Sequence, residues 1–178
     1  MCLILLLGSK KRGVTVPKPR KKSVLLDTSF LITLFDGSRA NHDNAKNYYK
    51  YFIENKIDMI ISSIVASEYA QKGSIGDIID TNNFITSDFN MVDGILAGEF
   101  SNVLSGESSN TGDSRIAVKD DIKLLAQCSN NGMDYIATDD SSTLAKYTRR
   151  LNELDKLKTH VITMNNYDIS IFNGGQTA

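Results

Sequence analysis

The sequence predicts an α/β fold of three layers, α/β/α, in which helices cover both faces of a central, mainly parallel sheet. Short apolar, β-branched runs alternate with segments whose apolar residues recur at helical spacing, and this alternation repeats along the chain. Strands joined through helices run parallel, and a sheet covered on both faces has such continuous apolar strands. The 178 residues, 41% of them hydrophobic, suffice to bury one sizeable core, so we expect one domain.

The first half of the chain holds three of the predicted strands. The apolar run that ends in Asp27 passes into helix-compatible residues, which the Asp36-Gly37 pair ends. Residues 43–55 place apolar side chains at i, i+3, i+4, i+7 and i+8, the spacing of an amphipathic helix. The predicted elements are strand 23–27, helix 28–35, helix 43–55, strand 57–62, helix 63–72 and strand 83–86.

The second half predicts two further strands and leaves both chain ends outside the domain. Residues 105–114 are too polar to pack and form a loop between two helices. The predicted elements are helix 90–104, helix 115–129, strand 135–138, helix 142–151 and strand 160–164. We therefore expect a folded domain at 23–165, preceded by a basic leader at 1–22 and followed by a C-terminal tail at 166–178.

The leader carries an unusual excess of positive charge. Residues 1–26 hold seven cations and no acid, and because the whole chain carries −1, the rest of it carries −8. One interpretation is a flexible, solvated segment, and the other is an arm that grips nucleic acid. The seven cations are Lys10, Lys11, Arg12, Lys18, Arg20, Lys21 and Lys22.

The composition excludes several classes of protein. Cys2 and Cys128 cannot build a disulfide framework, and two histidines are too few for a zinc cluster. The apolar run at 3–7 is far shorter than the roughly 20 residues that a spanning helix needs. We therefore expect a cytoplasmic protein without a membrane span, in which oxygen atoms hold any metal.

Acidic residues directly follow two of the predicted strands. Asp27 follows the first strand, and Asp139 and Asp140 follow strand 135–138. In open parallel sheets, ligands bind beyond the carboxyl ends of the strands, so these acids are candidate site residues. The alternative is that each of them only caps the helix that comes next.

Two further acids lie on helices that should press onto the sheet. Glu68 stands beside the apolar stripe of its helix, where an unpaired carboxylate would be costly; an edge position or a structural ion pair is the alternative. At about 100° per residue, Asp121 lies roughly 40° from the apolar Leu125. Asp120 points away from that face. We expect Asp121 to border the core and Asp120 to face water.

These acids would share one cleft only if a cation balanced their charge. Converging carboxylates repel one another and raise one another's pKa values unless a metal ion neutralises them. Mg²⁺ and Mn²⁺ prefer carboxylate and water oxygens, and Mg²⁺ usually keeps several of its waters. The sequence therefore predicts Mg²⁺ or Mn²⁺ as cofactor.

The pattern resembles the PIN-domain family of metal-dependent ribonucleases, which includes the toxins of many prokaryotic toxin–antitoxin pairs. The resemblance covers roughly residues 23–164 and rests on four short motifs in the family's order and spacing. The motifs are Val24-Leu25-Leu26-Asp27-Thr28-Ser29, Glu68 on the helix after the second strand, Asp121-Ile122-Lys123-Leu124-Leu125-Ala126-Gln127-Cys128, and Tyr135-Ile136-Ala137-Thr138-Asp139-Asp140. The basic leader, the loop at 105–114 and the tail depart from the family's pattern.

The resemblance implies four acidic positions at the site. These are Asp27, Glu68, Asp121 and Asp140. Asp140 stands two residues after Thr138, as the family's Thr-x-Asp element requires, although the interposed Asp139 could serve in its place. The resemblance also implies that the hydroxyls of Thr28 and Thr138 orient the carboxylates.

The activity that the resemblance implies is hydrolysis of phosphodiester bonds in single-stranded or structured RNA, leaving a 5′ phosphate. It also implies an antitoxin protein as partner and a homodimer. Cations at element ends are candidates for holding the phosphates, while His42 and His160 are interpreted as ordinary surface or core residues. The candidate cations are Arg39, Lys72, Arg115 and Lys146.

Three other functions compete with this interpretation. A phosphatase of the haloacid-dehalogenase type would need a carboxylate two residues after Asp27, where Ser29 stands. A nucleotide-binding switch would need a glycine-rich loop ending in Lys-Ser or Lys-Thr, and the sequence has none. A non-catalytic PIN-like module that binds RNA or a partner protein is the serious alternative.

Overall fold

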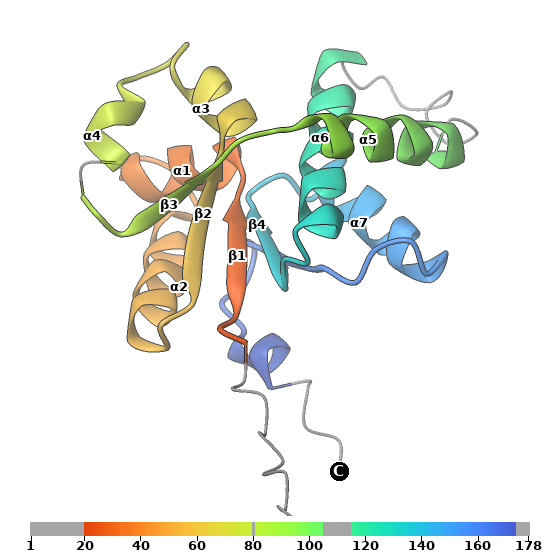
Figure 1. Ribbon diagram of the computed structural model, residues 1–178. Helices are drawn as coiled ribbons and strands as arrows, with labels where there is room; N and C mark the ends of the chain where they lie inside the picture. Colours follow the sequence, from red (N-terminus) through yellow and green to blue (C-terminus); the bar gives the residue numbers. More distant parts are fainter. Residues whose placement is uncertain (1–19, 80, 105–114, 174–178) are drawn as a thin grey trace, which may run out of the picture.

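A computed structural model of the chain describes residues 20–79, 81–104 and 115–173. They form one five-stranded sheet, all parallel, in the order β3-β2-β1-β4-β5 (Figure 1). The strands are β1 Ser23–Leu26, β2 Asp58–Ser62, β3 Phe84–Ser87, β4 Tyr135–Thr138 and β5 His160–Thr163. The helices are α1 Thr28–Phe35, α2 His42–Glu54, α3 Ser63–Tyr69, α4 Ile75–Ile79, α5 Met91–Leu104, α6 Arg115–Asn130 and α7 Leu144–Glu153, with a 3-10 helix at Ile169–Phe172.

Helices cover both faces of the sheet. Figure 1 shows α1 and α2 on one side and α6 and α7 on the other, with α5 packed against α6. The predicted three-layer α/β/α architecture with a parallel sheet is confirmed. Within the described ranges, every helix is too short or too polar for a membrane crossing.

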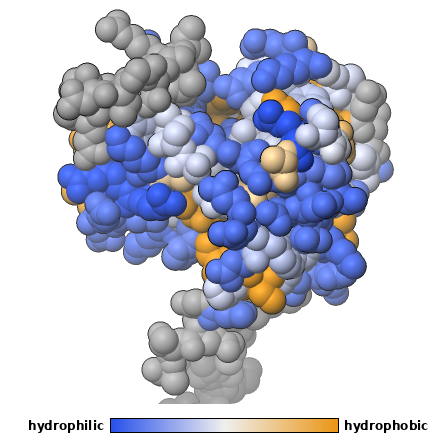
Figure 2. All heavy atoms as spheres, turned by 180° about the vertical axis from the view of Figure 1, so that it is seen from behind, coloured by the Kyte–Doolittle hydropathy of each residue, from blue (hydrophilic) through white to orange (hydrophobic). Residues whose placement is uncertain are grey.

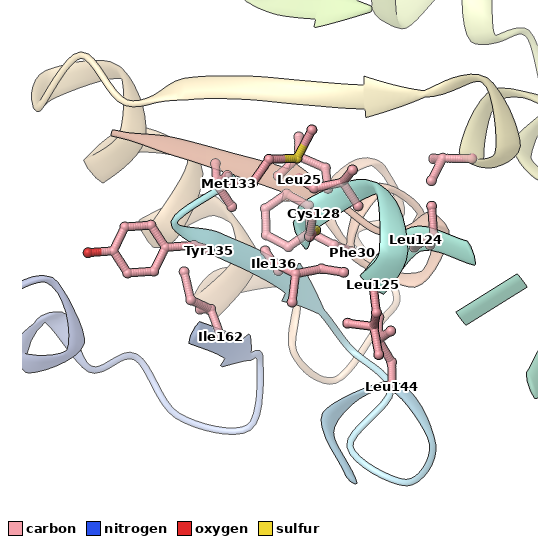
Figure 3. Packing of buried hydrophobic residues seen from close by; sticks show 14 of the residues in the cluster. Leu25, Phe30, Leu124, Leu125, Cys128, Met133, Tyr135, Ile136, Leu144 and Ile162 are labelled. Atoms are coloured by element: carbon pink, nitrogen blue, oxygen red, sulfur yellow. The ribbon is translucent and has the colours of Figure 1, made fainter. Parts of the chain in front are cut away.

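The core lies between the sheet and α6 on one face and between the sheet and α1 on the other. Every residue of β4 is buried, which explains why its sequence is apolar without alternation. Figure 3 shows Leu124, Leu125 and Cys128 of α6 near Ile136 of β4, all of them at most 1% exposed. On the face shown in Figure 2, hydrophilic residues predominate and apolar atoms form small separate groups. The apolar periodicity of the sequence therefore gave the packing faces correctly.

Two details of the element pattern differ from the prediction. Helix α4 was not predicted, because its apolar residues Ile75, Ile78 and Ile79 span only five positions beside two glycines, too short a run to indicate a helix. Helix α3 ends at Tyr69, three residues before the predicted end, because the amides of Lys72 and Gly73 both donate to the carbonyl of Tyr69 and turn the chain. The predicted polar loop at 105–114 lies outside the described residues.

The folded unit extends beyond the predicted boundaries at residues 22 and 165. Arg20 pairs with Asp134 at 2.8 Å, and Lys22 donates to the backbone carbonyl of Phe172 at 2.7 Å. Phe172 is only 5% exposed, and its ring stacks on Tyr51 with 4.5 Å between centroids. The last three leader residues and the described part of the tail are thus packed against the domain.

Candidate active site

A polar cleft of about 470 Å³ opens beyond the carboxyl ends of the central strands. Its acids come from different parts of the fold: Asp27 directly follows β1, Glu68 lies on α3, and Asp140 follows β4 by two residues. All four acids of the expected site line this one cleft. The full lining is Asp27, Thr28, Ser29, Ile32, Arg39, Glu68, Gln71, Lys72, Asp120, Asp121 and Asp140.

Asp27 lies at the start of α1 and is held by hydroxyl groups. Its Oδ2 accepts hydrogen bonds from the amide and hydroxyl of Ser29 and from Thr138 Oγ1 at 2.8 Å. The backbone N–H of Thr28 is a further hydrogen-bond donor to this carboxylate. The side chain is 7% exposed, and burial raises the pKa of the carboxyl group although these hydrogen bonds act in the opposite direction. Asp27 therefore caps α1, as the alternative interpretation held, and also presents one oxygen to the cleft.

Glu68 is half-buried on α3 and is held in the same way. Thr28 Oγ1 donates to its Oε2, and its Oε1 receives no hydrogen bond from a described residue. Burial raises the pKa of the carboxyl group, and the nearby charges of Asp27 and Asp120 raise it further. The structural ion pair that the sequence left open is not formed among the described residues.

Asp121 borders the core, as expected, and lines the cleft. Thr143 Oγ1 donates to its Oδ2 at 2.6 Å, and its Oδ1 receives no hydrogen bond from the described chain. Burial raises its pKa from 3.8 to about 7, with further contributions from the charges of Asp27, Asp140 and Glu68. The four acids therefore act on one another electrostatically.

Asp140 differs from the other three acids because both of its oxygens are engaged. Its Oδ1 accepts from the amides of Ser142 and Thr143 and from the Ser142 hydroxyl, and its Oδ2 accepts from Thr143 Oγ1 at 2.8 Å. Burial acts to raise the pKa of Asp140, but these hydrogen bonds outweigh it and lower the pKa. Asp140 thus fixes the turn before α7, but it does not cap that helix, whose N-cap is Thr143.

Asp139 does not line the cleft. Its carboxylate accepts hydrogen bonds from Thr33 Oγ1 and from Asn41 Nδ2, both at 2.7 Å, and so ties β4 to α1 and the start of α2. Of the two neighbouring acids that the sequence offered, the structure places Asp140 in the cleft.

The prediction that Asp120 faces water was wrong. Its side chain is 21% exposed, lines the cleft and pairs with Lys123 at 2.7 Å. The angular argument assumed that α6 buries a single face against the sheet. The charge of Asp120 raises the pKa of Glu68 on α3, so the side of α6 that carries Asp120 borders the cleft that it shares with α3 instead of open solvent.

Two of the four candidate phosphate-binding cations lie in the cleft. Arg39 and Lys72 line it, and neither forms an ion pair within the described ranges. Lys146 is not part of the lining; its ammonium lies 5.8 Å from the centre of the Tyr147 ring. The side chain of Arg115 lies outside the described atoms.

Neither histidine lines the cleft. A ring nitrogen of His42 lies 3.0 Å from the carbonyl oxygen of Thr33. His160 is exposed at the start of β5. The sequence interpretation of both residues as ordinary agrees with these positions.

Sequence reasoning missed two hydroxyl residues that organise the acids. Ser29 Oγ lies 3.0 Å from Thr138 Oγ1 and accepts from the amide of Asp139 at 2.8 Å, so it joins the ends of β1 and β4. Thr143, 5% exposed, contacts both Asp121 and Asp140. Both follow a candidate acid by two or three residues, and that spacing was the available signal.

The donor groups suit a hydrated magnesium or manganese ion. Within the part of the chain that the structure describes, no three His, Cys, Asp or Glu side chains form a ready-made metal cage. However, a hydroxyl fixes one oxygen of each of Asp27, Glu68 and Asp121, and the second oxygens of Glu68 and Asp121 accept no hydrogen bond from the described chain. Mg²⁺ commonly binds through one or two carboxylates and keeps its remaining waters, so these residues fit such an ion.

The chain has a PIN-like fold, similar to that of chains in three solved VapBC structures. VapBC2 from Rickettsia felis, in a crystal structure with a DNA fragment from its promoter, is 15% identical with a TM-score of 0.52 over 79% of this chain and 98% of that one. DNA-bound VapBC from Salmonella typhimurium is 14% identical with a TM-score of 0.51, covering 80% and 98% of the two chains. VapBC-1 from nontypeable Haemophilus influenzae is 12% identical with a TM-score of 0.53, covering 81% and 99%.

These likenesses confirm the predicted PIN-like fold. No protein-family model matches the chain, and no curated protein matches it. Since the identities are low, the activity has to be argued from the cleft itself.

Proposed function

We propose that the chain is a Mg²⁺- or Mn²⁺-dependent endoribonuclease whose catalytic acids are Asp27, Glu68, Asp121 and Asp140. The observation that carries the proposal is the shared arrangement of the first three acids. Each comes from a different part of the fold, a hydroxyl orients one oxygen of each, and the second oxygens of Glu68 and Asp121 accept no hydrogen bond from the described chain. Buried carboxylates with a purely structural role are usually paired with cations. Here the cations Arg39 and Lys72 line the cleft but form no ion pair with these acids, which favours a functional role for the acids.

The residues of the cleft have distinct roles in hydrolysis. Arg39 and Lys72 bind phosphate oxygens of the RNA backbone on either side of the scissile bond. Thr28, Thr138 and Thr143 hold the carboxylates in one orientation, which reduces the reorganisation needed when substrate arrives. When bound, the metal ion would acidify a water molecule and balance the negative charge of acids and phosphate.

The cleft lining favours recognition of the RNA backbone over stacking on its bases. The lining contains one apolar side chain, Ile32, and no aromatic ring. Unstacked bases are usually held on aromatic rings, whereas phosphates are held by cations. We therefore assign the choice of cleavage site to the shape of the RNA and to groups outside the cleft.

The direct test is cleavage of a mixed-sequence RNA with Mn²⁺ by the wild type and by Asp27→Asn. The variant should lose at least about a hundredfold in rate, since even residues that only orient metal ligands contribute 10–100-fold. Glu54→Gln, an exposed acid on α2, is the matched control and should cleave at the wild-type rate. Equal cleavage by wild type and Asp27→Asn would refute the assignment.

A non-catalytic PIN-like module that binds RNA is the second candidate. The absence of a ready-made metal cage among the described residues favours it, as does the use of both Asp140 oxygens in the turn before α7. RNA binding without any cleavage in Mn²⁺ would establish this alternative.

The toxin role extends the proposal to partners. The structures that resemble this chain are of VapBC pairs, and by analogy we propose a small antitoxin protein as partner, a homodimer and a cytoplasmic location. Growth arrest on expression, relieved by co-expressing the product of an adjacent small gene, would support the toxin role. Growth unaffected by an active enzyme would oppose it.

A further inference from the structure

Cations gather at the amino ends of the strands, at the opposite edge of the sheet from the acidic cleft. Residues 20–22 enter β1 there and border two hollows, one of about 420 Å³ beside β4 and one of about 390 Å³ beside the end of α2. We call these two hollows and their lining the amino-end surface. Its cations are Arg20, Lys21, Lys22, Lys56, Lys156 and Lys158.

This surface has a positive excess although the whole chain carries −1. Only two carboxylates, Asp134 and Asp155, line the hollows against the six cations, and both lie in the first hollow. Asp134 is paired with Arg20, and Asp58 nearby is paired with Lys21. The second hollow therefore contains cations and no acid among its lining residues.

Three of the six cations have no competing partner within the described ranges. Lys56, Lys156 and Lys158 are exposed, and their ammonium groups form no ion pair or hydrogen bond with another described residue. Surface lysine side chains usually point into solvent without a partner, but these three border hollows large enough for a phosphate group. They provide charge that the fold itself does not use.

An aromatic ring stands among the cations of the second hollow. Tyr51 is partly exposed there and stacks on Phe172, which is buried beneath Lys22. A ring supported from behind and bordered by lysines is the combination that single-stranded nucleic acids use, with bases on the ring and phosphates on the cations. A flat bilayer would not follow two concave hollows.

From this arrangement we infer that the amino-end surface binds the phosphate backbone of single-stranded RNA, at a site separate from the acidic cleft. In the sequence, four further cations and no acid precede Arg20. They are Lys10, Lys11, Arg12 and Lys18. The inference does not depend on nuclease activity, since it concerns binding by residues that touch none of the catalytic acids.

The test is fluorescence anisotropy of a labelled 30-nucleotide mixed-sequence RNA with the full chain in EDTA, at several salt concentrations. One variant carries Lys56→Gln, Lys156→Gln and Lys158→Gln. The matched control carries Lys46→Gln, Lys119→Gln and Arg149→Gln, three exposed cations that line neither hollow. The first variant should bind about tenfold more weakly and show a salt slope smaller by about 2, while the control should change neither quantity appreciably.

Three outcomes would overturn the inference. Equal losses in the two triple variants would show that only net charge matters. Full retention of binding in the first variant, together with loss on replacing the four leader cations, would assign binding to the leader alone. Tighter, salt-sensitive binding to vesicles containing phosphatidylserine than to RNA, lost in the first variant, would assign the surface to membranes. Because EDTA prevents metal-dependent cleavage, failure of this test and failure of the nuclease proposal can be told apart.

Discussion

Carboxylates at the two edges of the sheet have different partners. At the amino ends, Asp134 and Asp58 each lie against a cation, Arg20 and Lys21. At the carboxyl ends, Asp27, Glu68 and Asp121 lie against hydroxyl groups, and burial raises the pKa of all three. A paired acid stabilises the fold, whereas a buried acid without a cation destabilises it at neutral pH. The difference indicates that the carboxyl-end acids are placed for binding a positive charge.

Neutralising Asp121 should have the largest effect and should move stability and activity in opposite directions. Because the pKa is raised from 3.8 to about 7, the folded state holds a proton that the unfolded state releases between these values. Stability of the metal-free wild type therefore falls as pH rises from 4 to 7. At pH 8, Asp121→Asn should be more stable on the order of 2–4 kcal/mol, at roughly 1.4 kcal/mol per pKa unit, and should lose RNA cleavage.

Urea unfolding in EDTA at pH 8 and at pH 4 measures this difference. The advantage of Asp121→Asn should be full above pH 7 and should shrink toward zero near pH 4, where the wild-type carboxyl is protonated in both states. Glu54→Gln, at an exposed acid, should show no such pH dependence. A variant that is less stable than wild type at both pH values would show that the Asp121 carboxylate makes net favourable contacts.

Metal binding should turn the destabilising effect of the buried Asp121 carboxylate into a stabilising one. If the acids bind Mn²⁺, the ion stabilises the folded state by ligand linkage, about 2.7 kcal/mol at a hundred times the dissociation constant. Differential scanning fluorimetry should show a rise in melting temperature that Asp121→Asn removes. Asp120→Asn should reduce the rise less, because Asp120 is paired with Lys123. Identical responses of the two variants would contradict the choice of Asp121 as the ligand.

The fold could be predicted from the sequence because its signals are local and repeated. Apolar runs such as Tyr135-Ile136-Ala137 are buried on both faces, and helical periodicity gave most element boundaries within two residues. The tail gave no such signal. Phe172 lies in a short segment that mixes apolar and polar residues, and its partners Tyr51 and Tyr135 are far away in sequence, so only the folded chain reveals the contact.

The candidate site could be predicted only in part. Asp27 and Asp140 were found because acids after parallel strands meet at one edge of the sheet. Asp120 was misplaced because a helical wheel measures angles to one buried face and carries no information on elements distant in sequence, such as α3, whose Glu68 lines the same cleft. Thr143 was missed because a hydroxyl near a helix start usually serves as a cap, and its contact with Asp121 spans 22 residues.

Removing the hydroxyl of Thr143 should have an effect of intermediate size, because this residue contacts two acids of the cleft. Its single hydroxyl hydrogen faces two carboxylates, Asp121 at 2.6 Å and Asp140 at 2.8 Å, so it fixes their relative position. Thr143→Val keeps the shape and removes the hydroxyl; we expect cleavage to fall about 10–100-fold and the Mn²⁺ concentration for half-maximal activity to rise. Thr143→Ser should restore both. Loss of stability without a change in metal dependence would indicate a purely structural role.

The smallest effects should come from the amino-end ion pairs. Arg20→Gln should reduce stability by only about 0.5 kcal/mol, because its side chain is 59% exposed and its pair with Asp134 is screened by solvent. Asp134→Asn should cost somewhat more, since Asp134 Oδ2 also accepts the amide of Ser23 at 2.8 Å at the start of β1. Urea unfolding at pH 8 compares these variants directly with Asp121→Asn. Replacing Asp134 should therefore destabilise the protein, whereas replacing Asp121 at the opposite edge should stabilise it, and a rise in stability for Asp134→Asn would remove this contrast.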